Sequence, residues 1–368
     1  MKKSEVFFTN FRTTFSENIL QKLRRLLVVA GIKNINFQDK FTAIKIHFGE
    51  PGNTAYLRPN FAKVVVDLVK ELGGKPFLTD CNTLYVGGRK NALDHIDAAY
   101  VNGFSPFSTG CHVIIADGLK GTDEIYVPVK KGEFVKEAKI GRAIVDSDII
   151  ISLNHFKAHE GEGIGGAIKN LGMGCGSRAG KMEMHSTGKP NVRSNLCIGC
   201  MACSKNCAHD AIFFENNIAA INHDKCVGCG RCIGVCPKDA IVPAKDHSPE
   251  ILNCKTAEYA QAVITGKPNF HVSLVMDVSP YCDCHSENDA PIVNDVGMFA
   301  SFDPVALDRA CVDAVNNQPL LPGTIMEERK KIHNDHFRNL HPTTDWHSKL
   351  IHAEKMGLGT QEYKLIEI

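Results

Sequence analysis

The sequence lacks an excess of charge of either sign. Its 368 residues include 42 lysines and arginines against 41 aspartates and glutamates, which leaves a formal net charge of +1. A chain so evenly balanced has no broad field that attracts nucleic acid or an anionic membrane, and we expect neither as a partner.

Long apolar runs are absent as well. No stretch approaches the roughly 20 apolar residues of a membrane-spanning helix. The N-terminal MKKSEVFFTNFRTTF has neither the continuous apolar core nor the small-residue cleavage site of a signal peptide. We therefore expect a cytoplasmic protein.

Cysteine, in contrast, is abundant. The chain has 15 cysteines, an odd number. Disulfides are disfavoured in a reducing cytosol, so clustered cysteines there indicate metal or redox chemistry.

Eight of the cysteines lie in two copies of one segment. CIGCMACSKNCAHDAI begins at Cys197 and CVGCGRCIGVCPKDAI begins at Cys226, and eight of the sixteen aligned positions are identical. Each copy has the spacing C-x2-C-x2-C-x3-C, in which three thiolates can hold three corners of one cubane cluster, while the fourth ligates the other cluster in bacterial ferredoxins. We therefore predict two 4Fe-4S clusters, one bound by Cys197, Cys200, Cys203 and Cys236 and the other by Cys226, Cys229, Cys232 and Cys207.

Structural zinc and disulfides are the alternative interpretations. Zinc sites usually combine two separated cysteine pairs rather than runs of three plus one. Pro237 follows the last cysteine, as in the ferredoxin pattern, whereas Ala208 takes that place in the first copy. Between the copies, residues 212–221 predict a small hairpin that turns at Asn216-Asn217. The segment 191–245 as a whole resembles a two-cluster ferredoxin.

The rest of the chain alternates short apolar strands with helices. A helix is predicted to begin at Pro59 and to end at Gly73-Gly74, with an apolar stripe from Phe61 to Leu72. The alternation indicates an α/β fold with a mostly parallel sheet flanked by helices. The predicted strands are 42–48, 76–79, 112–116, 148–153 and 271–276.

This pattern predicts four parts of the chain. We expect the first part of the α/β body at 1–190, a ferredoxin-like α+β insert at 191–245, the second part of the body at 246–320 and a helical C-terminal extension at 321–368. In the extension, Thr324 and Glu327 predict a capping box, and a second helix is predicted to begin near Asp345.

Polar residues follow the apolar part of each predicted strand. In open α/β sheets ligands bind beyond the carboxyl ends of the strands, so these side chains can converge on one crevice. The alternative for each one is an ordinary loop residue or helix cap. The residues are His47, Asp80, Asp117, Asn154 with His155, and Asp277.

Residues 154–181 are predicted as an unusual glycine-rich loop. Eight of the twenty residues from Gly161 to Gly180 are glycine. A G-x-G-x-x-G pattern follows a strand, but the chain enters the cysteine segment where a dinucleotide-binding unit needs its second strand, so nicotinamide binding is a weak alternative. Backbone amides at a helix start favour an anionic ligand, although a loop that packs beside the clusters is the other interpretation. The cofactor-binding candidates are Gly161, Gly163, Gly166 and Lys169, and Lys157, Arg178 and Lys181 add positive charge.

Cys282, Cys284 and His285 form a third group. Two thiols and an imidazole within four residues can bind a metal or contact a substrate. A metal site would be completed by His47, His155 or His159 only if the fold brings one of them close, and the remaining alternative is a structural role. The other cysteines have no partner at a ligand spacing and are expected to be small buried residues; they are Cys81, Cys111, Cys175, Cys254 and Cys311.

Four segments resemble the domain-of-unknown-function 362 family of iron–sulfur proteins. They are IHFGEPGNTAYLRPNF at 46–61, DCNTLYVGGRKNALDH at 80–95, KAHEGEGIGGAIKNLGMGCGSRAGKMEMHS at 157–186 and SPYCDCHSENDAPIVNDVGMFASFDPVALDRA at 279–310. The resemblance implies an α/β body and cytoplasmic redox work, but it supplies no substrate. It singles out His47, Asp80, Asn82, His155, Lys157, His159, Lys169, Cys282, Cys284, His285 and Asp303.

The leading hypothesis is an oxidoreductase. Its clusters would pass electrons between a redox partner protein, or another electron donor, and an anionic small-molecule ligand at the strand ends. His155 or His159 would move protons, Lys157 and Lys169 would hold the anion, and Asp80 is a further catalytic candidate. The alternatives are a non-catalytic electron carrier or redox-sensing ligand-binding protein, and a protein in which the clusters only brace the fold.

Overall fold

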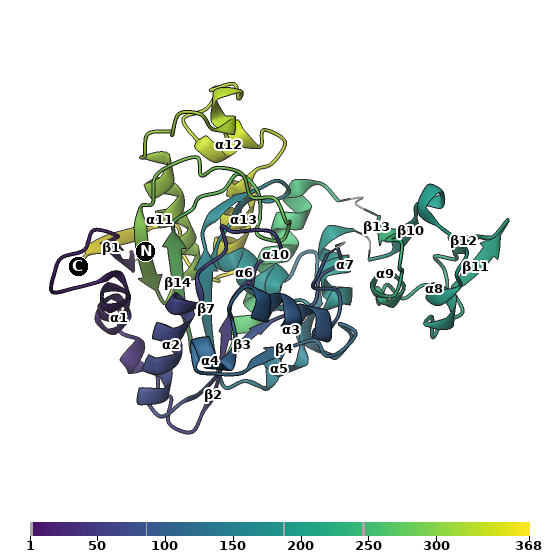
Figure 1. Ribbon diagram of the computed structural model, residues 1–368, viewed down its shortest axis with the longest axis horizontal. Coiled ribbons are helices and arrows are strands. Elements are labelled where there is room, and N and C mark those ends of the chain that lie inside the picture. The colour runs from purple at the N-terminus through teal and green to yellow at the C-terminus, as the bar shows by residue number, and fades with distance from the viewer. Residues whose placement is uncertain (1–2, 86, 187, 245–246) are drawn as a thin grey trace.

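The computed structural model describes residues 3–85, 87–186, 188–244 and 247–368, and within these ranges its centre is an eight-stranded sheet. The strand order is β16-β1-β15-β14-β7-β2-β3-β4 (Figure 1). The strands are β1 (Ser4–Asn10), β2 (Phe41–Lys45), β3 (Lys75–Asp80), β4 (Val113–Ile115), β7 (Ile149–His155), β14 (Asn269–Val275), β15 (Gly297–Ser301) and β16 (Tyr363–Glu367).

The sheet is mostly parallel. β14, β7, β2, β3 and β4 pair in parallel, so their carboxyl ends meet at one edge. β15 is antiparallel to both of its neighbours, because it returns directly from β14. The predicted α/β class is confirmed, and β2, β3, β4, β7 and β14 correspond to the five predicted strands.

Helices cover both faces of the sheet. The helices among the described residues are α1 (Ile19–Val29), α2 (Pro59–Glu71), α3 (Ala92–Val101), α4 (Pro106–Thr109), α5 (Arg142–Asp146), α6 (Ala167–Cys175), α7 (Arg178–His185), α8 (Ala202–Lys205), α9 (Arg231–Gly234), α10 (Pro249–Ile264), α11 (Pro304–Asn316), α12 (His336–Leu340) and α13 (Trp346–Lys355), of which α8 and α9 lie in the cysteine segment, away from the sheet. Successive strand residues face opposite cores: Ala43 packs with α6, α10, α11 and α13, and Ile44 packs with α1, α2 and α3. No helix among the described residues is long and apolar enough to cross a bilayer.

Helix α2 begins and ends where the sequence predicts. Pro59 occupies the first turn, where its missing N–H leaves no helical hydrogen bond unmade. Gly73, with φ of +83°, adopts the left-handed conformation just past the end. Phe61, Val65 and Leu68 lie on the buried face. The apolar stripe therefore packs α2 against the sheet, as expected.

Two-stranded sheets surround this body. They are β5 (Glu124–Pro128) with β6 (Glu137–Gly141), β8 (Lys157–His159) with β9 (Gly163–Gly165), β10 (Pro190–Val192) with β13 (Ile241–Pro243), and β11 (Ile212–Glu215) with β12 (Ile218–Ile221). The pair β10–β13 closes the base of the cysteine segment, which extends from one side of the body (Figure 1). The predicted hairpin is confirmed, and its turn residues Asn216 and Asn217 have φ of 48° and 63°. The predicted boundary between residues 245 and 246 lies outside the described residues.

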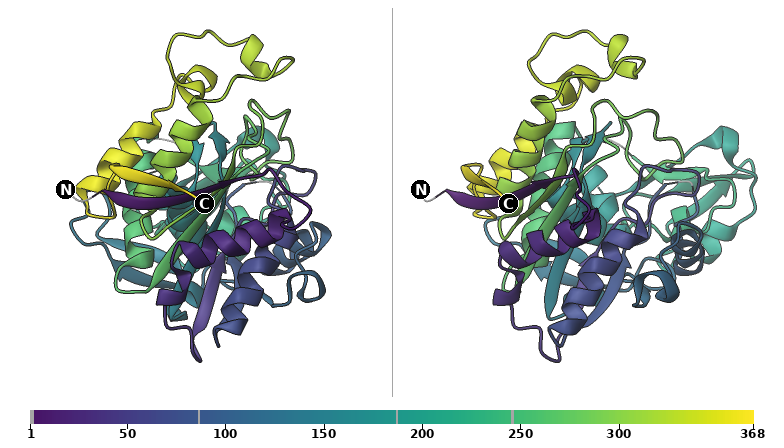
Figure 2. Two further views of the ribbon diagram at one scale, coloured as in Figure 1. Left: turned by 90° about the vertical axis from the view of Figure 1, so that its left-hand side faces the viewer. Right: turned by 60° about the vertical axis from the view of Figure 1, so that its left-hand side comes forward.

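The C-terminal extension holds helices α12 and α13 but also returns to the sheet. Helix α13 begins after its N-cap Asp345, as predicted. Strand β16, which the sequence pattern does not predict, pairs in parallel with β1, and Figure 2 shows the yellow and purple strands side by side. The predicted capping box is wrong, because Thr324 donates its hydroxyl to the Leu321 carbonyl and Glu327 accepts from the Gly323 amide.

Candidate functional site

The two copies of the cysteine segment adopt the same backbone. Gly199 and Gly228, at equivalent places, have φ of 65° and 73°, and Met201 and Gly230 have φ of 62° and 69°. A one-turn helix follows in each copy, α8 in the first and α9 in the second. The sequence duplication is therefore a structural duplication, in which left-handed residues bend each cysteine run into a tight loop.

The eight cysteines line two separate hollows, and each hollow takes three cysteines from one copy and one from the other. The first is lined by Cys197, Cys200, Cys203 and Cys236. The second is lined by Cys226, Cys229, Cys232 and Cys207. This is the interleaved grouping that the ferredoxin spacing implies.

Backbone amides point at the fourth cysteine of each run. Ala211 N lies 3.4 Å from Cys207 Sγ, and Ala240 N lies 3.2 Å from Cys236 Sγ, at equivalent places in the two copies. N–H groups that donate to sulfur in this way help to set the reduction potential of an iron–sulfur cluster.

The lining of the two hollows is better suited to thiolates bound to a metal than to thiolates without one. Burial, and then the neighbouring thiolates of Cys229 and Cys226, raise the pKa of Cys232 to about 12. Burial likewise raises the pKa of Cys203. Four sulfurs gathered between apolar walls bind soft, thiophilic metals, so the donor sets fit iron–sulfur clusters.

Arg178 places a buried positive charge beside the second hollow. Only 1% of the residue is exposed. Burial lowers the pKa of Arg178, whereas the charges of Asp117 and Cys232 favour its ionised form. A side chain at Gly234 would collide with the guanidinium, so this glycine allows the close approach. Arg178 therefore faces the cysteine segment rather than an anionic ligand.

A cavity that is partly open to solvent lies at the carboxyl ends of β2, β3 and β7. Ligands of open α/β sheets bind at this edge of the sheet. The structure brings most of the predicted site residues into its lining: His47, Asp80, His155, Lys157, His159, Gly166, Lys169, Cys284 and His285.

Other strand-end residues have structural partners instead. Asn82 donates to Asp117 at 2.8 Å, Asn154 donates to a backbone carbonyl of β14, and Asp277 pairs with Arg58. None of these residues lines the cavity in the described part of the chain. The predicted convergence therefore holds for His47, Asp80 and His155 but is wrong for Asp117, Asn154 and Asp277.

Asp303, which the family resemblance singles out, also lies away from the cavity. It is the N-cap of α11 and accepts from the amides of Val305 and Ala306. Its other carboxylate oxygen accepts from Ser4, the first residue of β1, and from Thr360, which precedes the edge strand β16. Its observed role is to cap the helix and to fix this edge of the sheet.

The glycine-rich segment is a hairpin followed by helices rather than a loop. Gly161 and Gly163 lie at the β8–β9 turn and do not line the cavity among the described residues. Helix α6 begins after Gly166, but its first two amides already donate to the buried carboxylate of Asp308, at 2.6 and 3.0 Å. The prediction that this helix start binds an anion is therefore wrong, because Asp308 occupies its amides.

Buried ion pairs hold two of the predicted catalytic residues, Asp80 and Lys157, in place. Lys45 Nζ lies 3.0 Å from Asp80 Oδ1, and Lys157 Nζ lies 2.9 Å from Asp283 Oδ2. Burial opposes ionisation, but Lys45 lowers the pKa of Asp80, and His155 and Lys157 lower the pKa of Asp283. Asp80 is thus the counter-ion of Lys45, and Lys157 is the counter-ion of Asp283. Lys157 is therefore not free to bind an anionic ligand.

The two predicted proton carriers are also engaged. Both ring nitrogens of His155 face acceptors, the Asp283 carboxylate and the Met276 carbonyl, so both donate. The Nδ1 atom of His159 accepts two backbone amides of the β8–β9 turn, which places its proton on Nε2. His285 is better suited to exchange a proton, because a 2.6 Å hydrogen bond to Glu160 raises the pKa of His285 and its ring lines the cavity.

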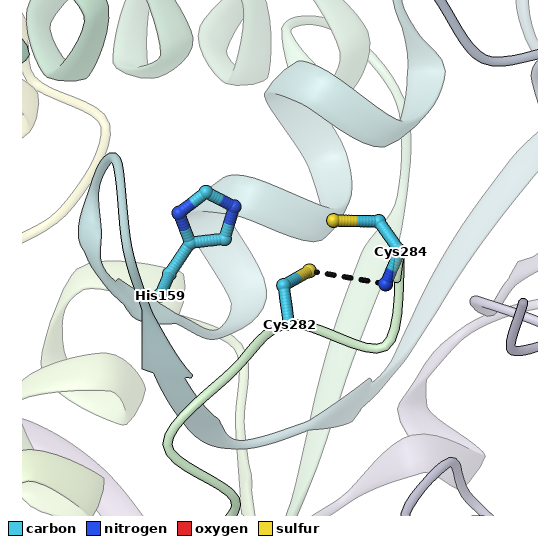
Figure 3. Close-up of side chains that lie close together, drawn as sticks. All are labelled: His159, Cys282 and Cys284. Atoms are coloured by element: carbon cyan, nitrogen blue, oxygen red, sulfur yellow. Dashed lines mark hydrogen bonds between the residues drawn. The ribbon is translucent and has the colours of Figure 1, made fainter. Parts of the chain in front are cut away.

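Of the three histidines considered as a further ligand beside Cys282 and Cys284, the structure brings one, His159, close to them. The Sγ atoms of Cys282 and Cys284 and a ring nitrogen of His159 all lie within 4.8 Å of one another (Figure 3). His47 instead contacts Arg89 at 2.8 Å, and burial, followed by the charge of Arg89, holds the pKa of His47 well below its ordinary value. Of the remaining cysteines, Cys81, Cys111, Cys175 and Cys311 are buried, as expected, and Cys254 is half-buried.

Sequence reasoning missed several residues of the cavity. The lining also includes Tyr85, Arg89, Glu160 and His185, and Asp283 forms an ion pair with the lining residue His155. All of them lie in the segments that carry the family resemblance, which is the only signal that pointed to them.

Helix α7 connects the cysteine segment with the cavity. Arg178 lies beside the second hollow, and Met182, one turn later, packs in an apolar cluster with Leu84 and Cys203. His185, at the end of the helix, lines the cavity and lies 2.9 Å from the hydroxyl of Tyr85. One face of a single helix therefore spans the two regions.

Comparison with known proteins identifies the family. The family model described as Domain of unknown function (DUF362) matches residues 42–313. No curated protein matches the chain. Among solved structures, a protein from Thermotoga maritima is 14% identical with a TM-score of 0.43, over 84% of this chain and 60% of that chain. The lactate racemase apoprotein from Thermoanaerobacterium thermosaccharolyticum is 10% identical with a TM-score of 0.34, over 74% of this chain and 51% of that one. This chain thus spans little more than half the length of either structure. Because the family match covers most of its length, the chain belongs to the family described as Domain of unknown function (DUF362).

Proposed function

We propose that the protein binds two 4Fe-4S clusters within the segment 191–245 and transfers electrons between a redox partner and an anionic small molecule in the strand-end cavity. The observation that carries the proposal is the interleaved grouping of the eight cysteines, three plus one in each hollow. When bound, such clusters supply one-electron transfer. A cytoplasmic location is part of the proposal, because reducing conditions keep thiolates such as the exposed Cys200 from oxidation.

Continuous packing between the cysteine segment and the cavity supports electron transfer. Leu84 lines the cavity and packs in the same apolar cluster as Cys203 and Ile233. Its neighbour Tyr85 lies with its ring centroid 6.2 Å from that of His285. Buried side chains therefore join the first hollow to the cavity without an intervening layer of solvent.

Positive charge in the cavity supports an anionic ligand. Lys169 and Lys181 line the cavity, and among the described residues no carboxylate lies within ion-pair distance of either. The Nζ atom of Lys181 donates only to the Gly176 carbonyl, at 2.6 Å. Lysine ammonium groups bind carboxylates and phosphates through charge-assisted hydrogen bonds, so Lys181 takes the anion-binding role that was predicted for Lys157.

The test is iron and acid-labile sulfide analysis of anaerobically purified full-length protein. Cys207→Ser and Cys226→Ser remove ligands of the same proposed cluster, so the double variant should retain as much iron as either single variant, about half of the wild-type content. Cys207→Ser combined with Cys197→Ser should lose nearly all of it. Cys254→Ser, which lies outside both hollows, is the matched control and should retain all of it.

Two outcomes contradict the proposal. One is stoichiometric zinc in place of iron and sulfide. The other is equal iron loss in the two double variants, since that result excludes interleaved ligation. Reoxidation of the reduced protein by candidate anions then separates an oxidoreductase from a non-catalytic carrier or sensor.

A further inference from the structure

Cys282 and Cys284 lie close together in a turn after β14. Their Sγ atoms are within 4.8 Å of each other, and Figure 3 shows the Cys284 sulfur directed toward the ring of His159 and the Cys282 sulfur directed toward the backbone nitrogen of Cys284, 3.4 Å away. The turn is fixed by a hydrogen bond from His285 N to the Cys282 carbonyl, at 3.1 Å. Two thiols this close together can reach disulfide distance when the turn and the side chains adjust.

The two thiols differ in exposure and acidity. Cys282 is fully buried, and burial raises the pKa of its thiol to about 11. Cys284 lines the cavity, and a hydrogen bond from Cys282, together with the charge of Lys169, lowers the pKa of Cys284 despite its burial. An accessible acidic thiol beside a buried, less acidic one suits thiol–disulfide exchange, in which the first attacks and the second resolves.

The surroundings favour thiolates over a metal cation at this place. Lys169 Nζ lies 3.2 Å from Cys282 Sγ, where the ammonium charge favours the neighbouring Cys284 thiolate and repels a metal cation. His159 Nδ1 accepts the amides of Gly161 and Glu162, at 2.9 and 3.0 Å, so its proton lies on the other nitrogen. A metal-bound histidine usually has the opposite arrangement, in which the second nitrogen donates to an acceptor.

We propose that Cys282 and Cys284 are a redox-active pair that cycles between a dithiol and a disulfide. The inference rests on the proposed function, because the electrons arrive through the segment 191–245. Cleavage of the S–S bond consumes two electrons, which a low-potential one-electron donor would supply through the clusters that the segment 191–245 would hold. It also consumes two protons and yields two thiols. Two clusters that each carry one electron would therefore hold the two electrons that cleavage of one S–S bond requires.

A proton donor stands beside the pair. A ring nitrogen of His285 and a carboxylate oxygen of Glu160 both lie within 4.8 Å of Cys284 Sγ. His285 donates to Glu160 at 2.6 Å, an arrangement that favours the imidazolium form. His285 therefore delivers protons to the pair when the bond is cleaved, and they reach it from solvent through the cavity that His285 and Cys284 line.

The opposite half-cycle is exchange with a small disulfide. The Cys284 thiolate attacks one sulfur of the acceptor, forms a mixed disulfide and releases the first thiol. Cys282 then attacks Cys284 Sγ, re-forms the internal bond and releases the second thiol. One disulfide forms for each one reduced, so bonds, protons and electrons balance.

The experiment follows thiols in the full-length protein, purified anaerobically with its iron content measured first. After treatment with oxidised glutathione and removal of the reagent, thiols are blocked with a maleimide and the peptide that contains residues 282–284 is analysed by mass spectrometry. We expect this peptide to carry two labels in reduced protein and none in oxidised protein. Reduced methyl viologen should restore both labels.

Variants separate the pair from the clusters. Cys282→Ser and Cys284→Ser should abolish the internal bond and leave the iron content unchanged, whereas Cys254→Ser, a half-buried thiol elsewhere, should behave as wild type. Cys207→Ser/Cys226→Ser, which lacks one proposed cluster, should form the bond but be reduced by viologen at least tenfold more slowly.

Two labels after oxidation in iron-replete protein overturn the inference and leave the proposed function intact. A stoichiometric metal that Cys284→Ser loses without loss of cluster iron overturns it in favour of a metal site. Absence of iron from the wild type contradicts the proposed function itself.

Discussion

The Nζ atom of Lys349 lies 2.8 Å from a carboxylate oxygen of Glu162, and both side chains are completely excluded from solvent. Lys349 belongs to α13 and Glu162 to the β8–β9 turn, so this ion pair ties the C-terminal extension to the hairpin that carries Lys157 and His159. Lys349 also donates to the Ile164 carbonyl at 3.0 Å. The extension is thus part of the support of the cavity.

We predict that Lys349→Met destabilises the protein strongly. Removal of one partner of a buried ion pair leaves an uncompensated charge and costs about 3–5 kcal/mol. Lys355→Met on the same helix, whose partner Glu133 is exposed, should lower the stability far less. Urea unfolding of the anaerobic protein measures both values. If the double variant Glu162→Gln/Lys349→Met is no more stable than Lys349→Met, the buried charge is not the cause.

The sequence predicted the sheet body well because the signals there are local. Helix α2 has an apolar stripe, a proline at its start and a glycine at its end, and each of these acts within a few residues. Strand β16 carries no such signal, because it is stabilised by pairing with β1 at the other end of the chain. Long-range pairing of this kind depends on the assembled fold and not on local pattern.

The candidate site also combines features that a local sequence pattern predicts with features that depend on the assembled fold. The grouping of the eight cysteines follows from a duplicated spacing, so it could be proposed from the sequence alone. The anion prediction at the start of α6 failed because Asp308, which is distant in sequence, occupies the helix amides. Similarly, nothing near His285 in the sequence indicates Glu160 as its partner, and only the fold brings the two together.

We predict that Arg178→Met lowers the reduction potential of the cluster proposed for the second hollow. A reduced cluster is more negative, so the nearby guanidinium favours reduction. Loss of one such charge at a partly screened site is worth about 1.4 kcal/mol, or about 59 mV for one electron. Arg178→Lys keeps the charge and is the control. Redox titration followed by electron paramagnetic resonance makes the measurement, and an unchanged potential in Arg178→Met rejects this role.

We predict that Cys284 reacts with alkylating agents at unusually low pH. The thiolate is the reactive form, and the pKa of Cys284 lies below its ordinary value, so half-maximal alkylation should occur below the pH of about 8.5 at which a free cysteine ionises. Lys169→Met removes a charge that favours the thiolate and should move the midpoint upward by about one pH unit. Lys157→Met, whose partner is Asp283, is the matched lysine control. Rates of peptide labelling between pH 5 and pH 10 test this, and identical midpoints in wild type and Lys169→Met count against the assignment.

The strongest test of the ligand class is Lys181. It lines the cavity with only 7% of the residue exposed, and among the described residues it has a carbonyl but no carboxylate partner. A charge-assisted hydrogen bond to a bound anion is worth about 1.5–3 kcal/mol, so Lys181→Gln should weaken binding about tenfold to a hundredfold. Calorimetric titration of the anaerobic protein with inorganic phosphate and with small mono- and dicarboxylates gives the affinities, and the exposed Lys33→Gln is the control. An anion that binds wild type and Lys181→Gln equally, or a preference for neutral over charged members of the series, would show that the cavity does not select its ligand by negative charge.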